Sequence, residues 1–181
     1  MLARFAPRPA RRIRRGMTFV ECTLVLSVFL LLLFGIFEYC RFLLVLHITN
    51  NAARDGARYA SVMVSSTATA SVSQQQIIDY TKVRVSGVQN SIEGLAVAVY
   101  AVDQAGLDQT PSVVRAKTKT AGTYPDPFNS SDPNAVPWNS APFPDRIAVT
   151  IKGTYRPLLP TFLLMPSTIP INVTAIMGGE G

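Results

Sequence analysis

The sequence predicts an α+β protein: a long N-terminal transmembrane helix that extends outward and packs on a small antiparallel sheet, with one further short helix. The N-terminal third holds an uncharged apolar segment, 22–37, followed by an alanine-rich segment without proline. The C-terminal part holds two segments, 146–155 and 169–177, in which apolar and other residues alternate. A long apolar run is typical of a membrane-spanning helix, and alternation is typical of a strand.

Residues 1–16 form a basic leader that accounts for the whole net charge of +6. Its six arginines are Arg4, Arg8, Arg11, Arg12, Arg14 and Arg15. The remainder of the chain has eleven basic and eleven acidic residues and is formally neutral. The high pI is therefore no sign of a nucleic-acid partner, because the whole basic excess lies in one short leader, and we expect no nucleic acid to bind.

The long helix is predicted over residues 17–64. Residues 17–37 supply the roughly 20 residues that cross a bilayer. The arginines on the N-terminal side predict that this side stays in the cytoplasm. The rest of the chain is then periplasmic or extracellular, and the protein crosses the membrane once.

Small residues recur at helical spacing beyond the membrane segment. Ala52, Ala53, Gly56 and Ala57 form a stripe on which another helix or a sheet can pack closely. Glu38 and Arg41 are three residues apart on one helix face, where they can pair. We interpret this pair as a marker of the outer membrane boundary.

The outer domain is predicted over residues 65–181. It begins with a Ser/Thr/Ala-rich linker, 65–73, and a short helix, 74–85. Strands are predicted at 95–102, 113–118, 146–155 and 169–177, which give three or four antiparallel strands. Residues 121–144 contain six prolines and are predicted to form one long exposed loop. The apolar connection 157–166 either closes the core or forms an exposed partner surface.

The sequence contains no catalytic motif, so we expect no enzyme, no cofactor and no metal site. His47 is the only histidine, and CxxC, HExxH and glycine-rich phosphate motifs are absent. Cys22 and Cys40 are five helical turns apart, about 27 Å, which is too far for a disulfide between them.

Glu21 places a carboxylate near the start of the apolar segment. Such a group costs on the order of 3 kcal/mol in hydrocarbon and needs a partner. Gly16 lies five residues earlier, at the junction between the basic leader and the apolar helix. Cleavage between Gly16 and Met17 would create an α-amino group that can pair with Glu21. A plain signal anchor explains the same segment without using Gly16 or Glu21, and a secretory signal peptide lacks its small-residue cleavage site here.

These residues resemble the N-terminus of the TadE-like family, minor pilins (pseudopilins) of the tight-adherence Flp-type, type IVb pilus. The matching residues are Arg15-Gly16, Val20-Glu21, the leucine-rich run, residues 35–41 and the block 51–60 with its alanines and Arg-Asp-Gly-Ala-Arg. The resemblance covers residues 15–62, and 146–177 loosely.

The resemblance implies a pilus-assembly function in the bacterial inner membrane. A prepilin peptidase would cut after Gly16, and Glu21 would pair with the new N-terminus of an adjacent subunit. The implied partners are this peptidase, other pilin-like subunits, Tad-type inner-membrane assembly proteins and membrane lipid.

Two other readings remain open from the sequence. One is an unprocessed single-pass binding module that uses the aromatic side chains of its proline-rich loop, Tyr124, Phe128, Trp138 and Phe143. The other is a membrane-tethered enzyme, for which no motif proposes catalytic residues.

Overall fold

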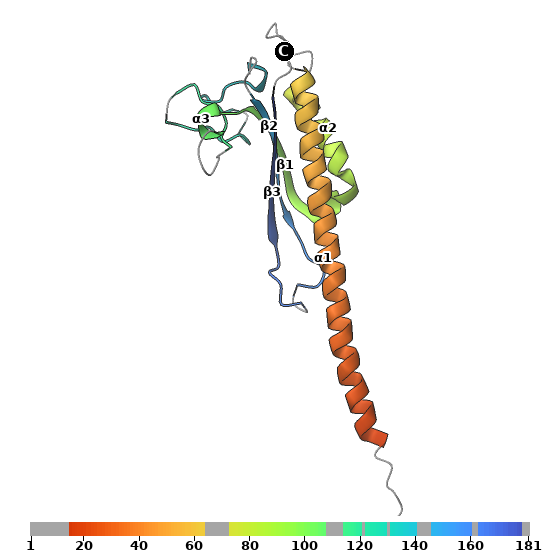
Figure 1. Ribbon diagram of the computed structural model, residues 1–181. Helices are drawn as coiled ribbons and strands as arrows, with labels where there is room; N and C mark the ends of the chain where they lie inside the picture. Colours follow the sequence, from red (N-terminus) through yellow and green to blue (C-terminus); the bar gives the residue numbers. More distant parts are fainter. Residues whose placement is uncertain are drawn as a thin grey trace, which may run out of the picture. The chain divides into compact units, whose positions relative to one another are not determined.

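The computed structural model confirms the α+β class: a long apolar helix, a three-stranded antiparallel sheet and a further short helix (Figure 1). It describes residues 15–63, 73–107, 114–120, 122–129, 131–140, 146–160 and 163–178, with side chains from Phe19 onward. The chain divides into two compact units, Met1–Phe37 and Glu38–Gly181, and the boundary falls within helix α1 (Arg15–Met63).

In the first unit, α1 presents apolar side chains on all sides. Every described residue from Phe19 to Phe37 is exposed except the half-buried Gly35. The helix is long and apolar enough to cross a membrane. Its hydroxyl groups bond within the helix: Thr23 donates to the Phe19 carbonyl (2.9 Å) and Ser27 to the Thr23 carbonyl (2.7 Å). These bonds satisfy polar groups that a bilayer would otherwise leave without partners.

In the second unit, the sheet has the order β1 (Ile92–Ala101), β2 (Arg146–Tyr155) and β3 (Ile169–Gly178). Both pairings are antiparallel, and Val149 lies opposite Val99 on one side and Ala175 on the other. The central strand β2 has the bounds that its alternation predicts, and β3 extends one residue further. The second predicted strand, 113–118, is wrong: its described part forms only two isolated bridges, Val102↔Ala116 and Thr118↔Ala135.

Strand β1 begins three residues before the predicted start. A register shift between Glu93 and Ala96 interrupts its pairing with β2, and Gly94 inside it has a φ of 65°. A positive φ suits glycine, which has no Cβ to clash. The bulge interrupts the alternation after Ile92, which explains why the sequence predicts the strand only from Leu95.

Helix α2 (Gln74–Val85) forms where the sequence predicts it. Ser73 caps its first turn, and the Gln76 side chain bonds back to the Ser73 backbone, which together make a capping box. A 3₁₀ turn, η1 (Ser86–Ser91), then leads into β1. The predicted linker, 65–73, otherwise lies outside the described residues.

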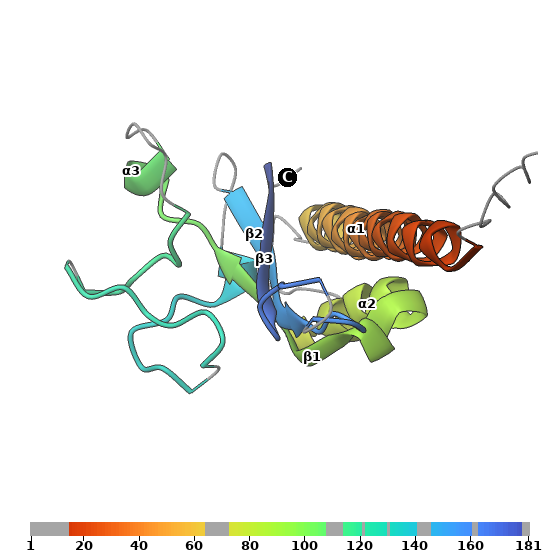
Figure 2. The same ribbon diagram turned by 90° about the horizontal axis from the view of Figure 1, so that it is seen from below.

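Both faces of the sheet are covered (Figure 2). The outer part of α1 and α2 cover one face and form the main core, which includes Val45, Ala52, Ala53, Ala57, Ile77, Val85, Val99, Ile147, Val149, Ile151 and Tyr155. The connection between β1 and β2, which carries α3 (Gln104–Leu107) and η2 (Trp138–Ser140), covers the other. This explains why β2 buries consecutive residues, 147–151, and not alternate ones.

The proline-rich stretch 121–144 is not one exposed loop, contrary to expectation. Trp138 is buried in the main core and Pro125 is also buried. Backbone bonds attach the stretch to residues before it: Lys119 donates to the Asn134 carbonyl (3.0 Å) and Val136 to the Lys117 carbonyl (3.3 Å). Proline cannot donate such bonds, so the segment does not form a regular strand. Its sequence therefore lacks the alternation of a strand, although the segment is packed.

Candidate functional site

Glu21 is exposed on α1 among exposed apolar neighbours, Val20, Leu24 and Val25. Within residues 19–63 no side chain forms an ion pair with it. Gly16 and Met17, the predicted cleavage junction, lie in the first turn of α1, where the structure describes the backbone alone. In hydrocarbon the Glu21 carboxylate would therefore need a partner from outside these residues.

Glu38 has the opposite environment. It is 4% exposed, and its carboxylate accepts hydrogen bonds from the Tyr155 hydroxyl (2.5 Å) and the Leu158 N–H (3.3 Å). Arg41 completes the site, with Nη1 3.6 Å from the same carboxylate oxygen. The pairing expected from the spacing of Glu38 and Arg41 is therefore present. Their place at a membrane boundary stays a prediction.

Arg41 links this cluster to the start of β1. Its Nη2 donates to the Ser91 hydroxyl (3.0 Å), and its guanidinium lies 5.5 Å from the centre of the Tyr155 ring. The buried Nη1 makes no hydrogen bond, so the ion pair with Glu38 is what compensates its burial. Phe42 also packs against the Tyr155 ring, with ring centres 5.3 Å apart.

Burial raises the pKa of Tyr155 to about 12, and its hydrogen bond to the Glu38 carboxylate adds to the shift. The phenol therefore stays protonated and donates at all physiological pH values. The four groups (Glu38, Arg41, Tyr155 and the Leu158 N–H, hereafter the Glu38 cluster) bind helix α1 to the end of β2 and the segment after it. We interpret their arrangement as structural, since the Tyr155 hydroxyl, the Leu158 N–H and the Arg41 guanidinium are all directed at the Glu38 carboxylate.

The small-residue stripe packs inside the chain. Ala52, Ala53, Gly56 and Ala57 are all buried. A Cβ at Gly56 would collide with the Thr81 side chain of α2, so a glycine is what lets the two helices come this close.

Further contacts between the two helices surround this close approach. Tyr59 stacks on Tyr80 with ring centres 4.6 Å apart, and Arg84 lies 3.9 Å from Asp55. The stripe that offered a surface for another helix or a sheet is thus covered by α2 and the sheet of the same chain.

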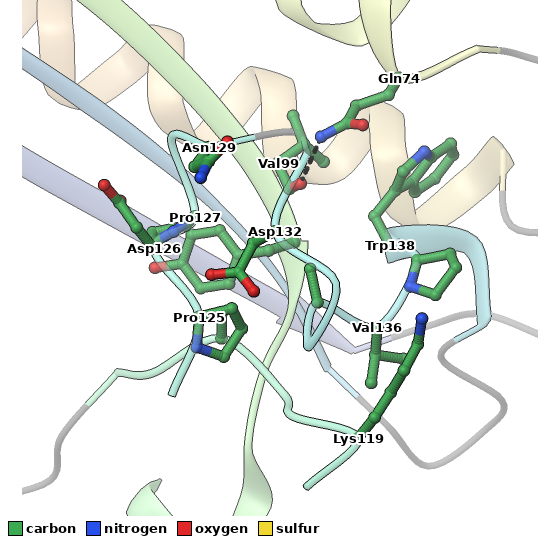
Figure 3. A pocket seen from close by; sticks show the side chains of 14 residues that line it. Gln74, Val99, Lys119, Pro125, Asp126, Pro127, Asn129, Asp132, Val136 and Trp138 are labelled. Carbon is green, nitrogen blue, oxygen red and sulfur yellow. Dashed lines mark hydrogen bonds between the residues drawn. The ribbon is translucent and has the colours of Figure 1, made fainter. Parts of the chain in front are cut away.

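A cavity of about 310 Å³ lies between β1 and the connection that follows it, and its lining includes Gln74 of α2, Val99 of β1 and Trp138 of η2. Figure 3 shows Asp126, Asn129 and Asp132 on one side of it, Trp138 and Val136 on the other, and the bond from Gln74 Nε2 to the Val99 carbonyl (2.9 Å). The oxygens of Asp126, Asn129 and Asp132 accept bonds from backbone N–H groups two residues further on. Among the described residues no cluster of histidine, cysteine and acidic residues could hold a metal ion.

The aromatic surface of the binding-module reading is not assembled as expected. Trp138 is 6% exposed and belongs to the core. Phe128 is half-buried beneath Lys152, whose Nζ lies 4.2 Å from the ring centre, and only Tyr124 is largely exposed. Phe143 lies outside the described residues. The prediction that Trp138 is a contact residue is wrong, because it fills the core beside α2 and β1.

Sequence reasoning missed Tyr155 and Ser91, the partners of Glu38 and Arg41. One signal pointed to Tyr155: it continues the period of Ile147, Val149 and Ile151, which places it on the core face of β2. Nothing local distinguishes Ser91, which ends a polar turn.

Comparisons with known proteins bear on α1. A model of the TadE-like protein family matches residues 16–58. This range includes the predicted cleavage junction, Glu21, the Glu38–Arg41 pair and the small-residue stripe. No curated protein and no solved structure matches the chain. The TadE-like family implies association with the Tad pilus machinery. The resemblance drawn from the sequence is confirmed over residues 16–58, where the chain is similar to TadE-like proteins.

Proposed function

We propose that this chain is a minor pilin or assembly subunit of a tight-adherence pilus machine, processed by a prepilin peptidase after Gly16. The observation that carries the proposal is the match of residues 16–58 to the TadE-like family, which begins at this glycine. The chain acts by assembly and carries out no reaction of its own.

The exposed apolar half of α1 supports packing within a membrane. Its leucines and phenylalanines from Phe19 to Phe37 are between 39% and 75% exposed. Within their own unit they have no core to fill. Lipid and the equivalent helices of other pilin-like subunits supply the apolar surroundings that they need.

Glu21 would set the register of this packing. Its carboxylate has no ion-pair partner among residues 19–63, and a new α-amino group on Met17 of a neighbouring subunit provides one. Pairing two such groups offsets the cost of desolvating each, and it favours one axial stagger between subunits over others.

The N-terminus lies in the cytoplasm of a bacterial cell, and the outer domain lies beyond the inner membrane. This orientation follows from the arginines of the leader. The outer domain then faces the periplasm or the cell exterior, where it decorates or caps the assembly of helices.

The experiment is the intact mass and N-terminal sequence of the protein from membranes, with and without the prepilin peptidase. A chain that begins at Met17 only in the presence of the peptidase supports the proposal. A chain that begins at Met1 in both strains contradicts it and favours an unprocessed membrane anchor.

The role of Glu21 is tested separately with Glu21→Gln, and Cys22→Ser serves as the matched control at the next exposed position. Both variants should be processed. Only Glu21→Gln should lose co-purification with pilin-like subunits, because it removes the charge that pairs with the amine. Equal recovery of subunits with both variants would contradict a pairing role.

A further inference from the structure

The connection between β2 and β3 exposes leucines in water. Residues 157–166, hereafter the leucine loop, contain no charged residue. Leu158, Leu159 and Leu164 are 65%, 40% and 95% exposed. Of the two alternatives that the sequence left open, these three leucines favour an exposed apolar surface, while Pro157 at the start of the loop is buried.

The loop backbone holds Leu164 outward against its own conformational preference. Leu164 is the one described non-glycine residue with a positive φ, 53°. Two backbone bonds maintain the turn around it: Leu163 donates to the Leu159 carbonyl (3.2 Å) and Met165 to the Pro160 carbonyl (2.9 Å). A glycine or asparagine would adopt this conformation with less strain. Strained residues of this kind tend to occur where they serve a function, such as contact with a partner.

The loop begins at the point where the helix leaves its apolar segment. The Leu158 N–H donates to Glu38, and Glu38 follows Phe37, the last residue of the uncharged segment, directly in the chain. Tyr39, 59% exposed, comes next on the helix. Exposed tyrosines are enriched where membrane proteins meet the lipid headgroups.

The rim of the loop is close to neutral. Arg156 precedes it, but its guanidinium lies 2.8 Å from the Glu93 carboxylate, and both side chains are exposed. Glu38 is likewise compensated by Arg41. No unpaired charge among these groups opposes contact with hydrocarbon.

We propose that the leucine loop inserts Leu158, Leu159 and Leu164 into the lipid bilayer that α1 crosses, as a second membrane contact of the outer domain. This rests on the proposed membrane-spanning role of α1. We take the partner to be a lipid surface and not another protein. Glu38, which accepts the hydrogen bond from the Leu158 N–H, directly follows Phe37, the last residue of the segment that we propose to lie in the membrane. Paired charges at the rim predict little preference between zwitterionic and anionic lipid.

The test uses the full chain in phosphatidylcholine vesicles, with Cys22 and Cys40 replaced by alanine. A polarity-sensitive fluorophore is attached to Leu164→Cys, and in a second variant to Leu158→Cys. Val83→Cys is the matched control, because Val83 is an equally apolar side chain, 69% exposed, on α2. Leu31→Cys reports on the membrane-spanning segment.

Spin-labelled phosphatidylcholine should quench most of the emission at positions 164, 158 and 31, and leave position 83 unchanged. Quenching at position 31 without quenching at 164 and 158 would overturn the leucine loop proposal and leave the membrane anchor intact. No quenching at position 31 would overturn both. A blue shift at 164 that appears only at high protein-to-lipid ratio would overturn the lipid proposal in favour of a second copy of the chain.

Discussion

Helix α1 is one continuous element whose two parts differ in the size and the exposure of their side chains. From Phe19 to Phe37 its large side chains are exposed, and from Glu38 to Met63 its small side chains are buried. The first part carries leucine and phenylalanine side chains that are exposed and belong to no hydrophobic core cluster of the described residues. The second carries alanine and glycine against α2 and the sheet, and it even buries a carboxylate, Glu38, by surrounding it with donors.

The comparison teaches that side-chain size tells the two surfaces apart. Large apolar residues on every side of a helix are typical of a segment solvated by lipid or by other helices. A narrow stripe of small residues allows another element to approach the helix closely along one face. Here α2 and the sheet of the same chain occupy that face. Assembly contacts are therefore to be sought on the first part of α1, and stability of the outer domain on the second.

The largest effect should come from Glu38→Ala. Removing the carboxylate leaves the Tyr155 hydroxyl and the Nη1 of Arg41 buried without the group that compensates them, and breaking a buried ion pair costs about 3–5 kcal/mol. Unfolding of the full chain in detergent can be followed by the emission of Trp138, the only tryptophan. The control is Glu93→Ala, whose ion pair with Arg156 is exposed and should contribute less than about 1 kcal/mol. Equal effects of the two variants would contradict a structural role for the Glu38 cluster.

Gly56→Ala should reduce the free energy of unfolding by about 2 kcal/mol, because the new methyl group overpacks the contact with Thr81. The double variant with Thr81→Ala should recover most of this loss, since it removes the hydroxyl and methyl that the new group meets. Gly87→Ala is the control, because open space surrounds that position. Additive losses in the double variant would show that the helix contact is not the cause.

Raising the pH should destabilise the outer domain through Tyr155. Its pKa is about 12 in the folded chain and about 10 when unfolded, so the unfolded chain releases the proton first. The contribution, about 2 kcal/mol, is present below pH 10 and is lost as pH rises from 10 to 12. Tyr155→Phe should flatten this dependence in part, because burial also raises the pKa of Tyr100. An unchanged slope in Tyr155→Phe would exclude Tyr155 as its source.

The smallest effect is expected in the first part of the helix. Leu31→Ala should leave outer-domain unfolding within about 0.5 kcal/mol of the parent, since the side chain is 48% exposed and touches no core. Val45→Ala, which truncates a fully buried residue, should cost about 2 kcal/mol. If Leu31→Ala destabilised the outer domain as much as Val45→Ala, the two parts of the helix would not differ in the way described.

The elements that sequence predicted well are those whose hydrophobic period is uninterrupted. Strand β2 was predicted with its observed bounds, and α2 likewise, because apolar residues recur there at a regular spacing. The start of β1 was missed because Gly94 breaks the alternation at a bulge. Trp138 is buried but was predicted to lie on an exposed loop. The prolines on either side of it interrupt any helical or strand pattern of apolar residues, so the sequence does not reveal that this segment is packed.

The candidate site was predictable only where its partners are close in sequence. The three-residue spacing of Glu38 and Arg41 predicted their pairing. Tyr155 lies 117 residues beyond Glu38. A local sequence pattern does not predict which strand end packs against a given part of a helix. The same reason left the occupant of the small-residue stripe open, because a stripe predicts close approach and not which element approaches.

The long separation between Glu38 and Tyr155 also has a consequence for the order of biogenesis. During synthesis and export the helix is made first, and the residues that satisfy Glu38 come last, in the final sixth of the chain. Until then an ionisable group next to the membrane segment is without its native donors. In the membrane orientation that we propose, the outer domain completes its fold only after nearly all of it has crossed, and a truncation before Tyr155 should leave a protein that is inserted but not folded.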